Sequence, residues 1–599
     1  MDTDLVEAPE KPVSTELGLA LAASLALAAC GGSESDPSAP AAITSPSPVV
    51  TKPQTDAEAA RFLAQAGFGG RFADLEALKI SGYEAWLSQQ FDAIPPVTRW
   101  EYAKELRERD LPAYQNWQVV PNVMWQSIFV GKSAAGKDIV GQDVLRQRMT
   151  LALSEIFVVS YAGVDVGGPI KVLVMGHFMD LLQKSAFGNF RTLLEDVTLS
   201  IAMGRMLGML GNLKEDSRGR RPDENFAREV MQLFTIGLYE LNLDGSLKKG
   251  ADGKPIETYT LDTVSNLARV FTGWSAPLQF NSAGSDLEAT RQPMAFQAAY
   301  HSTLEKNFLG TSIPAGSAGP ASLGIALDTL FNHPNVGPFI GKQLIQRFVC
   351  SNPSPAYIAR VAMVFNNNGQ QVRGDLKAVL RAILLDPEAR QAPDLIGQTA
   401  GKHREPMIRL AQMIRTLDYK SPDGAWRLGN TNDPAWRIGQ VPLGASSVFN
   451  FFRPGYAPPG SELAKQGLVA PEMQIVSEIS TIVLINYLYN LLIDSRGSTL
   501  RTYNDANGVS QSDIKETGLS LFLDDEKALA DRPDVLLERF NILFACGQLS
   551  AGVKTAIINS ISKLSISDPN PARVNVLKQN RVIAMLLMVL SNPEYLVLK

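Results

Sequence analysis

The sequence predicts a mainly α fold: a large multi-helix body with long loops and a small β-hairpin insertion near residues 238–259. From Thr55 onward, apolar residues recur at every third or fourth position, which is typical of helices that bury one face. Signals for strands are sparse by comparison. The chain has 599 residues, 45% of them hydrophobic and 20% charged, an ordinary globular composition that allows a sizeable core.

Two segments illustrate the helical pattern. Residues 142–160 place apolar side chains at steps of three and four, with Arg146 and Arg148 off this stripe. Asp375 is placed to cap a helix that begins at residue 376, and Asp386-Pro387 is placed to end it. The same reasoning predicts helices over 56–67, 71–90, 170–185, 322–332, 335–349, 354–366, 403–417, 471–494, 526–545 and 570–592.

The clearest strand signal lies between residues 238 and 259. Asp244-Gly245 and Asp252-Gly253 are turn dipeptides between short alternating segments, so we expect one or two hairpins there. Gly and Pro cluster at 276–320 and 420–470, which we interpret as long surface loops. Sub-domain divisions of the helical body are expected near these two stretches.

Residues 1–29 resemble a bacterial lipoprotein signal peptide. Leu17 to Ala29 is an apolar run that is shorter than the about 20 residues of a membrane-spanning helix, and it leads directly to Cys30, whose thiol would carry the lipid. Residues 30–55, rich in Ser, Pro and Ala, are expected to form a tether before a helical domain over 56–599. The leader is acidic, which departs from ordinary signals, and an apolar N-terminal helix is the alternative.

The charge balance argues against nucleic-acid binding. Removal of residues 1–29 deletes five acidic residues and one basic residue, which changes the net charge from -5 to -1. Binding to phosphates needs a concentrated excess of Lys and Arg. If Cys30 is lipidated, Cys350 and Cys546 remain, and the sequence leaves open whether they form a disulfide or stay as buried free thiols.

The most organised polar segment is the predicted helix within 221–237. Its apolar face carries Phe226, Val230 and Leu233, whereas Gln232 and three further polar residues share the other face. Those three are Asn225, Arg228 and Glu229. A second predicted helix, within 259–274, ends at Thr272-Gly273-Trp274.

These two helices together resemble the large bacterial family known as domain of unknown function 1800. Further matching stretches are 61–69, 85–90, 301–310, 448–456 and 591–595, so the resemblance covers nearly the whole chain after the tether. It implies a mostly helical exported protein, often encoded beside an exported protein of another family, domain of unknown function 1501. It implies no reaction. Many members have His where this chain has Phe234, and a paired His where this chain has Tyr300-His301.

The residues allow one hypothesis for catalysis. Glu229 and His301 are the candidate catalytic groups, with Asn225, Arg228, Trp274 and Lys306 as candidate binding groups around a cleft. The alternative interpretations are a buried network that joins Asn225, Arg228 and Glu229 to the loops near Trp274, and a loop histidine bonded to the backbone.

Other motifs are weaker. No metal site or cofactor is expected, because the four histidines lack ligand spacing. Residues 131–138 nearly match a phosphate loop but end in Asp138 instead of Ser or Thr, so nucleotide binding is not expected. Asn242, Asp244 and Asp252 are calcium-ligand types that turn chemistry also explains. The aromatic loop 448–456 can line a groove or act as a hydrophobic plug.

The sequence therefore predicts an exported protein, in the periplasm or the outer membrane, anchored by a lipid on Cys30. Its expected role is to bind or assemble with another exported protein or an envelope polymer, the domain of unknown function 1501 protein being the partner that the resemblance implies. An extracytoplasmic hydrolase with a Glu/Asn/Arg/His site is the alternative. The sequence does not decide whether the chain is an enzyme.

Overall fold

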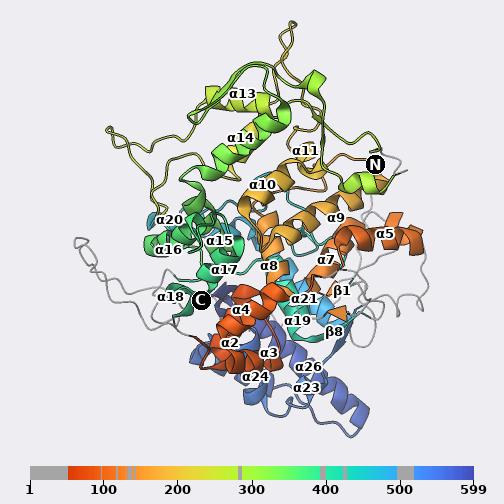
Figure 1. Ribbon diagram of the computed structural model, residues 1–599. Helices are drawn as coiled ribbons and strands as arrows, with labels where there is room; N and C mark the ends of the chain where they lie inside the picture. Colours follow the sequence, from red (N-terminus) through yellow and green to blue (C-terminus); the bar gives the residue numbers. More distant parts are fainter. Residues whose placement is uncertain are drawn as a thin grey trace, which may run out of the picture. The chain divides into compact units, whose positions relative to one another are not determined.

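The computed structural model in Figure 1 describes residues 51–95, 97–115, 119–129, 131–132, 138–139, 143–280, 286–391, 400–421, 426, 428–494 and 519–599. Over these residues the chain is mainly helical, which confirms the predicted fold class, and its strands form only two-stranded antiparallel pairs. The predicted signal peptide, Cys30 and the tether up to residue 50 lie outside the described residues.

The helices of the first third surround the long helix α9. They are α2 (Asp56–Ala66), α3 (Phe72–Ser81), α4 (Tyr83–Asp92), α5 (Arg99–Arg109), α6 (Leu111–Gln115), α7 (Val119–Phe129), α8 (Val144–Ser154), α9 (Gly168–Ser185), α10 (Phe190–Thr198) and α11 (Ile201–Met206). Helix α9 contacts α5, α7, α8, α10 and α11. Its N-terminus begins at Gly168-Pro169, where proline is tolerated because the first amides of a helix have no helical partner.

The middle of the chain alternates longer helices with loops. Its helices are α12 (Asn225–Gln232), α13 (Leu261–Val270), η1 (Glu288–Arg291), η2 (Ala298–Tyr300), α14 (Gly319–Asn332), α15 (Val336–Phe348), α16 (Pro355–Asn366), α17 (Leu376–Leu385) and α18 (Pro387–Arg390). Asp375 accepts a hydrogen bond from the Ala378 amide and caps α17, as predicted.

The last third contains a further group of helices. They are α19 (Pro406–Thr416), α20 (Glu462–Lys465), η3 (Pro471–Ile475), α21 (Glu478–Asp494), α23 (Asp524–Lys527), α24 (Pro533–Leu543), α25 (Ala551–Ser562), α26 (Pro571–Leu590) and α27 (Pro593–Leu596). Helix α26 packs against α21, α23, α24 and α25. Helix α2 also contacts α24, which joins the first third of the chain to the last.

The strands are short. They are β1 (Gly131–Lys132), β2 (Asp138–Ile139), β3 (Trp274–Ser275), β4 (Ala295–Phe296), β5 (Lys306–Phe308), β6 (Thr311–Ile313), β7 (Lys402–His403), β8 (Asp418–Lys420), β9 (Ser520–Phe522) and β10 (Val597–Leu598). Four pairs join strands that follow each other in the chain, although a long segment separates β8 from β9, whereas β7 pairs with β10. The β7–β10 pair brings Val597 opposite His403, so the chain end is fixed beside α19.

Several predicted helices are wrong in extent. The segment 142–160 is helical only over Val144–Ser154, and the helix expected over 471–494 is divided into η3 and α21. Two further predicted helices are interrupted by Gly or Pro. The helix expected over 71–90 is divided into α3 and α4 at Gly82, whose φ of 82° belongs to the left-handed region that favours glycine. The helix expected over 526–545 is likewise divided, because Pro533 lacks the N–H that would continue a helical hydrogen-bond ladder and instead begins α24. In both places a single Gly or Pro interrupts the helix, although the apolar period continues across it.

The predicted hairpin insertion is confirmed as a β ribbon between α12 and α13. Bridges pair Tyr239 with Glu257 and Leu241 with Leu247. Its two turns contain Gly245 and the corresponding glycine at 253, with φ values of 77° and 76°. We call residues 238–257 the ribbon. The sub-domain divisions expected near 276–320 and 420–470 stay predictions.

Helix α8 is buried on all sides. Arg146 and Arg148, which lie off its apolar stripe, are therefore inside the protein, and both are less than a tenth exposed. Arginine is almost never fully buried unless it is paired. The partners of these two arginines lead to the sites described next. No helix among the described residues is long and apolar enough to cross a membrane.

Candidate functional site

The predicted polar face of α12 is largely on the surface. Asn225 is exposed, and its backbone N–H donates a hydrogen bond to Asp223 Oδ1 at 2.8 Å. The Arg228 guanidinium forms an ion pair with Glu224 at 3.4 Å, and the Ser265 hydroxyl of α13 donates to the other Glu224 oxygen at 2.5 Å. Glu224 thus connects α12 to α13.

Glu229 is the buried member of the predicted set. Its side chain is 7% exposed, and Oε2 has no hydrogen-bond partner among the described residues. Burial raises the pKa of this carboxyl, and the nearby Arg228 partly opposes the shift. A raised pKa suits a general acid or base, so Glu229 keeps one of the properties that a catalytic role requires.

His301 lies in a second group of side chains. Its Nδ1 is 2.9 Å from the Thr272 carbonyl oxygen, and Nε2 has no partner among the described residues. Burial lowers the pKa of the imidazole, so the neutral ring donates through Nδ1 and carries its lone pair on Nε2. The Phe296 ring lies 5.4 Å from both the His301 and the Trp274 rings, because the β3–β4 pair places Phe296 opposite Trp274.

Lys306 is fully buried next to His301. Its ammonium donates to the Ser302 carbonyl at 3.0 Å and to the Leu304 carbonyl at 3.1 Å, which holds the loop before β5 in a closed turn. Burial lowers the pKa of Lys306. The Ser302 hydroxyl donates to Glu215 at 2.7 Å, which places a carboxylate beside this group.

The structure therefore divides the six predicted site residues into two groups. His301, Trp274 and Lys306 lie around β3, β4 and the loop before β5, whereas the other three belong to α12. Within the described residues, no hydrogen bond or ion pair joins Glu229 to His301. Their shared role in catalysis stays a prediction.

The remaining sequence motifs show ordinary turn and thiol chemistry. Asp244 Oδ1 accepts from the amide and the hydroxyl of Ser246 at 2.9 and 2.6 Å. Cys350 and Cys546 are both buried free thiols, and burial raises the pKa of Cys350 to about 12. In the described part of the chain, no group of three His, Cys, Asp or Glu side chains is placed to hold a metal ion. The phosphate-loop-like segment 131–138 lies partly outside that part.

The aromatic loop 448–456 is anchored through its backbone. Phe452 is buried, the Gln346 amide of α15 donates to the Pro454 carbonyl at 3.2 Å, and the Arg453 amide donates to Gln474 at 2.8 Å. The Arg453 guanidinium stacks 4.7 Å from the Phe449 ring. These contacts favour the hydrophobic plug over a groove.

A buried group of charges, which the sequence analysis missed, lies next to α8. We call it the ionic cluster; each member is at most 5% exposed. Its members are Arg148, Glu155, Arg347, Lys402, Arg404, Glu405, Arg409 and Glu472. Burying an ion costs several kcal/mol unless it is paired and hydrogen-bonded, so the pairing of these eight charges decides what the cluster can do.

Two ion pairs are present in the ionic cluster. Arg347 Nε lies 3.3 Å from Glu155 Oε2, and Lys402 Nζ lies 3.1 Å from Glu472 Oε1. Lys402 also donates to the Arg347 carbonyl at 2.7 Å, and Arg148 Nη2 donates to that same carbonyl. The backbone oxygen of Arg347 therefore joins α8, α15 and β7 at one point.

Two carboxyl groups of the ionic cluster lie against each other. Burial, and after it the charge of Glu405, raise the pKa of Glu155 well above its ordinary value of 4.5. Both effects favour the neutral form of the Glu155 carboxyl, so Glu155 offsets the surrounding positive charge less than an exposed glutamate would.

A small cavity of about 10 Å³ opens into the ionic cluster. Arg148, Arg347, Lys402, Arg404 and Glu405 line it, together with Gln412 and apolar side chains from α2, α15 and α19. This volume holds one water-sized particle. Arg148 Nε and Nη1, Arg404 Nε and Glu405 Oε1 are buried, and within the described residues they have no hydrogen-bond partner.

A larger cavity of about 290 Å³ lies on another side of α2. Its wall includes Arg61, Cys350, Ser354 and Glu388. Ser354 donates to Glu388 through its hydroxyl at 2.5 Å and through its amide at 3.0 Å, and Arg61 donates to the Arg390 carbonyl at 2.9 Å. Arg61, Ser354 and Glu388 are thus already engaged in hydrogen bonds within the protein.

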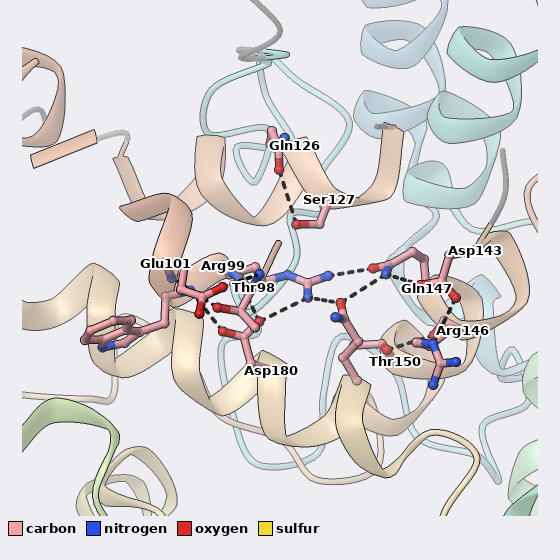
Figure 2. Close-up of polar contacts among 12 residues, drawn as sticks. Thr98, Arg99, Glu101, Gln126, Ser127, Asp143, Arg146, Gln147, Thr150 and Asp180 are labelled. Atoms are coloured by element: carbon pink, nitrogen blue, oxygen red, sulfur yellow. Dashed lines mark hydrogen bonds and ion pairs between the residues drawn. The ribbon is translucent and has the colours of Figure 1, made fainter. Parts of the chain in front are cut away.

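A second buried polar network, on the other side of α8, contrasts with the ionic cluster. We call it the Arg99 network. Figure 2 shows the Arg99 guanidinium between Gln147 and the carboxylate of Asp180. Arg99 donates to Gln147 at 2.9 Å and to Gln183 at 2.8 Å, and both Asp180 oxygens accept backbone amides at 2.9 Å. Here nearly every polar atom has a partner.

One signal in the sequence points to these buried charges. The helices that contain Arg148 and Arg347 carry apolar residues over most of their length, so neither helix has a fully polar face to place in water. Such charges are expected inside the protein. Which acidic residues meet them is not readable from either helix.

The comparisons with known proteins agree with the helical pattern. The family model described as protein of unknown function (DUF1800) matches residues 61–597, nearly the whole chain. The chain belongs to this family. The ionic cluster, the Arg99 network and the ribbon of this DUF1800 protein all lie inside the matched range. No curated protein and no protein of solved structure matches the chain significantly.

Proposed function

We propose that this DUF1800 protein is an exported, lipid-anchored binding protein that holds another exported protein through its ribbon. The observation that carries the proposal is that five large apolar side chains of the ribbon are partly exposed. They are Leu238, Tyr239, Leu243, Leu247 and Ile256, each between 37% and 49% exposed. A cluster of large apolar side chains in water typically marks an interaction site.

The base of the ribbon is held firmly. Asn335 lies directly before α15. Its side-chain Nδ2 donates to the backbone carbonyls of Ile236 and Tyr239, both at 2.8 Å, and its Oδ1 accepts from the backbone N–H of Leu241 at 2.9 Å. One side chain therefore fixes both the entry to the ribbon and its first segment. A fixed base lets the ribbon present its apolar side chains with little loss of entropy on binding.

Four charged side chains of the ribbon form two ion pairs. Lys248 lies 3.2 Å from Glu240 and Lys254 lies 4.0 Å from Asp252. These pairs reduce the charge that the ribbon presents beside its apolar side chains. This favours an apolar patch on a protein partner over a charged polymer.

The candidate catalytic groups support a binding role over an enzymatic one. Arg228 is held by Glu224, Lys306 is buried with two of its donors on backbone carbonyls, and Asn225 is exposed apart from them. Neither cavity described above is lined by any of the six predicted site residues. A binding surface needs no such cavity.

The anchor and the partner belong to the same proposal. A lipid on Cys30 would hold the chain at a membrane, and residues 31–55 would separate the helical body from it. The first partner to test is the exported domain of unknown function 1501 protein that the family resemblance implies.

Capture experiments test the binding role. The full chain is expressed with a tag and used to retain the purified domain of unknown function 1501 protein. Leu243→Asp and Leu247→Asp place charges among the exposed apolar side chains of the ribbon. Each should reduce the amount of retained partner at least tenfold. Ile80→Asp is the matched control, because Ile80 on α3 is 82% exposed and far from the ribbon in sequence. Equal retention by all variants would sink the proposal.

The anchor is tested separately. Cys30→Ala should move the protein from the membrane fraction to the soluble fraction, while retention of the partner in detergent extracts stays unchanged. Unaltered fractionation would remove the lipid anchor from the proposal and leave the ribbon intact.

The hydrolase remains the second candidate, because His301 Nε2 and Glu229 Oε2 are both buried without partners within the described residues. Glu229→Gln should then abolish any hydrolytic activity and leave the melting temperature near normal. Loss of folding in this variant would instead identify Glu229 as a structural residue.

A further inference from the structure

The ionic cluster has more positive than negative charge. Five cationic side chains face three carboxyl groups, which leaves an excess of two positive charges even when every carboxyl group is ionised. All eight side chains are buried, so solvent screening is weak. An uncompensated positive charge in a protein interior costs several kcal/mol. The cluster as described therefore lacks negative charge.

The unused donors of Arg148 indicate where an additional negative charge would bind. Arg148 presents Nε and Nη1 without partners among the described residues, while its Nη2 is bound to the Arg347 carbonyl and its face stacks 4.8 Å from the Phe348 ring. The stacking orients the edge of the guanidinium, and with it the two free N–H groups. Arg148 and Phe348 both line the small cavity.

Arg404 supplies a third unused donor to the same cavity. Its Nη1 is bound to the Tyr595 carbonyl and its Nη2 lies 3.6 Å from Cys546 Sγ, which leaves Nε without a partner in the described part of the chain. The Tyr595 ring lies 4.7 Å from the guanidinium and holds it in place. Two fixed arginines thus line one cavity with unused N–H groups.

The size of the cavity excludes most anions. Its volume of about 10 Å³ is that of one water-sized particle, so phosphate, sulfate and carboxylates of metabolites are too large. A monatomic halide is larger than water and enters only with a small outward shift of the side chains in the wall. A neutral water would satisfy some of the donors but would leave the excess charge in place. We propose that the cavity between Arg148, Arg404 and Glu405 is an internal binding site for one small inorganic anion of the halide type.

The anion would join segments that are far apart in the sequence. Arg148 belongs to α8, Arg404 precedes α19, and Arg404 is bound to the carbonyl of Tyr595 in α27. Binding to the folded state alone stabilises that state in proportion to the logarithm of the anion concentration. The site is independent of the ribbon and of the proposed partner, so either proposal can fail without the other.

Chloride and bromide are the probes. Thermal unfolding of the full chain in sodium chloride and in sodium gluconate of equal ionic strength should show a higher Tm in chloride, rising by about 1 °C per tenfold increase in concentration. Crystals grown in sodium bromide should give an anomalous scattering peak in the cavity. Equal Tm values in the two salts together with no bromide peak would overturn the proposal and identify the occupant as water.

Two variants should change the affinity for halide in opposite directions. Arg148→Met keeps the unbranched stem of the side chain but removes the guanidinium, with its charge and its unused donors, so the chloride dependence of Tm should disappear. Glu405→Gln removes negative charge from the cavity wall, so halide should bind at least tenfold more tightly. Arg381→Met is the control, since Arg381 is exposed and paired with Glu84 at 2.6 Å, and it should leave the dependence unchanged.

If Arg148→Met does not fold, Glu405→Gln and the bromide peak carry the test. If Tm depends on chloride equally in the wild type, Arg148→Met and Glu405→Gln, chloride acts at the protein surface, and the internal site is rejected.

Discussion

Helix α8 divides two buried polar regions that differ in how completely their atoms are paired. On one side, the Arg99 network balances Arg99 and Arg146 against Asp180 and Asp143, and its glutamines bridge the charges (Figure 2). On the other side, the ionic cluster has five cations, three carboxyl groups and unused donors around a cavity.

The difference teaches how to separate structural polarity from a site for a ligand. Burial alone does not distinguish the two regions, because arginine side chains are below a tenth exposed in both. The distinguishing features are charge balance and unsatisfied donors. A balanced, satisfied network rigidifies the core, whereas an unbalanced one with free donors has room for a ligand.

The largest expected effect on stability comes from a substitution in the Arg99 network. Arg99→Met removes the cation that faces Asp180 and leaves a fully buried carboxylate without its ion pair. We expect a loss of about 3–5 kcal/mol in the free energy of unfolding, measured by chemical denaturation. Arg148→Met, measured without halide, should lose less, because Glu155 keeps Arg347 as its partner. Equal losses would contradict the distinction between the two regions.

A smaller effect concerns how the stability that the Arg99 network provides depends on pH. Burial raises the pKa of Asp143 from 3.8 to about 6, so between these values the folded state binds more protons than the unfolded state. The free energy of unfolding therefore falls as pH rises from about 4 to 6. Asp143→Asn lacks this term, so its stability relative to the wild type should rise by about 1–3 kcal/mol over that range and stay constant above it.

Denaturation of both proteins at several pH values between 4 and 7.5 measures this difference. A difference that does not vary with pH would show that Asp143 is already ionised in the folded protein at pH 4.

A second pH-dependent effect reports the positive field of the ionic cluster. Burial first, and then Arg409, Lys402 and Arg404, lower the pKa of His403 from 6.5 to about 3. The unfolded state therefore binds the proton more readily, and stability is lost as pH falls from 6.5 towards 3. His403→Gln should reduce the slope of stability against pH in this window.

Chloride sharpens the same measurement. An anion in the cavity partly cancels the field of the arginines, so the pKa of His403, followed by NMR, should be higher in chloride than in gluconate. An identical pKa in both salts would argue that the cavity holds no charge.

The smallest expected effect on stability lies outside both regions. Leu243→Asp on the ribbon should change the free energy of unfolding by less than about 0.5 kcal/mol, because the side chain is exposed and leaves no cavity. Its effect should instead appear in partner retention. A large loss of stability would show that the ribbon packs on the body rather than presenting a free surface.

Sequence periodicity predicted local features better than contacts. The cap at Asp375 and the two ribbon turns follow from a few neighbouring residues, and they are confirmed. The helices over 71–90 and 526–545 were predicted too long, because Gly82 and Pro533 interrupt an apolar period that continues across them. Among the six predicted site residues, burial was not foreseen for Lys306, whose carbonyl partners are set by a loop.

The sequence by itself determined that this chain is a helical member of the DUF1800 family with a ribbon between α12 and α13, because helical period, capping and turn chemistry act over fewer than about ten residues. Only the tertiary structure decided where the buried charges meet. Arg148 and the Arg347 carbonyl are 199 positions apart and join because α8 and α15 pack together. Contacts across such distances depend on how whole helices pack, and no local pattern encodes them.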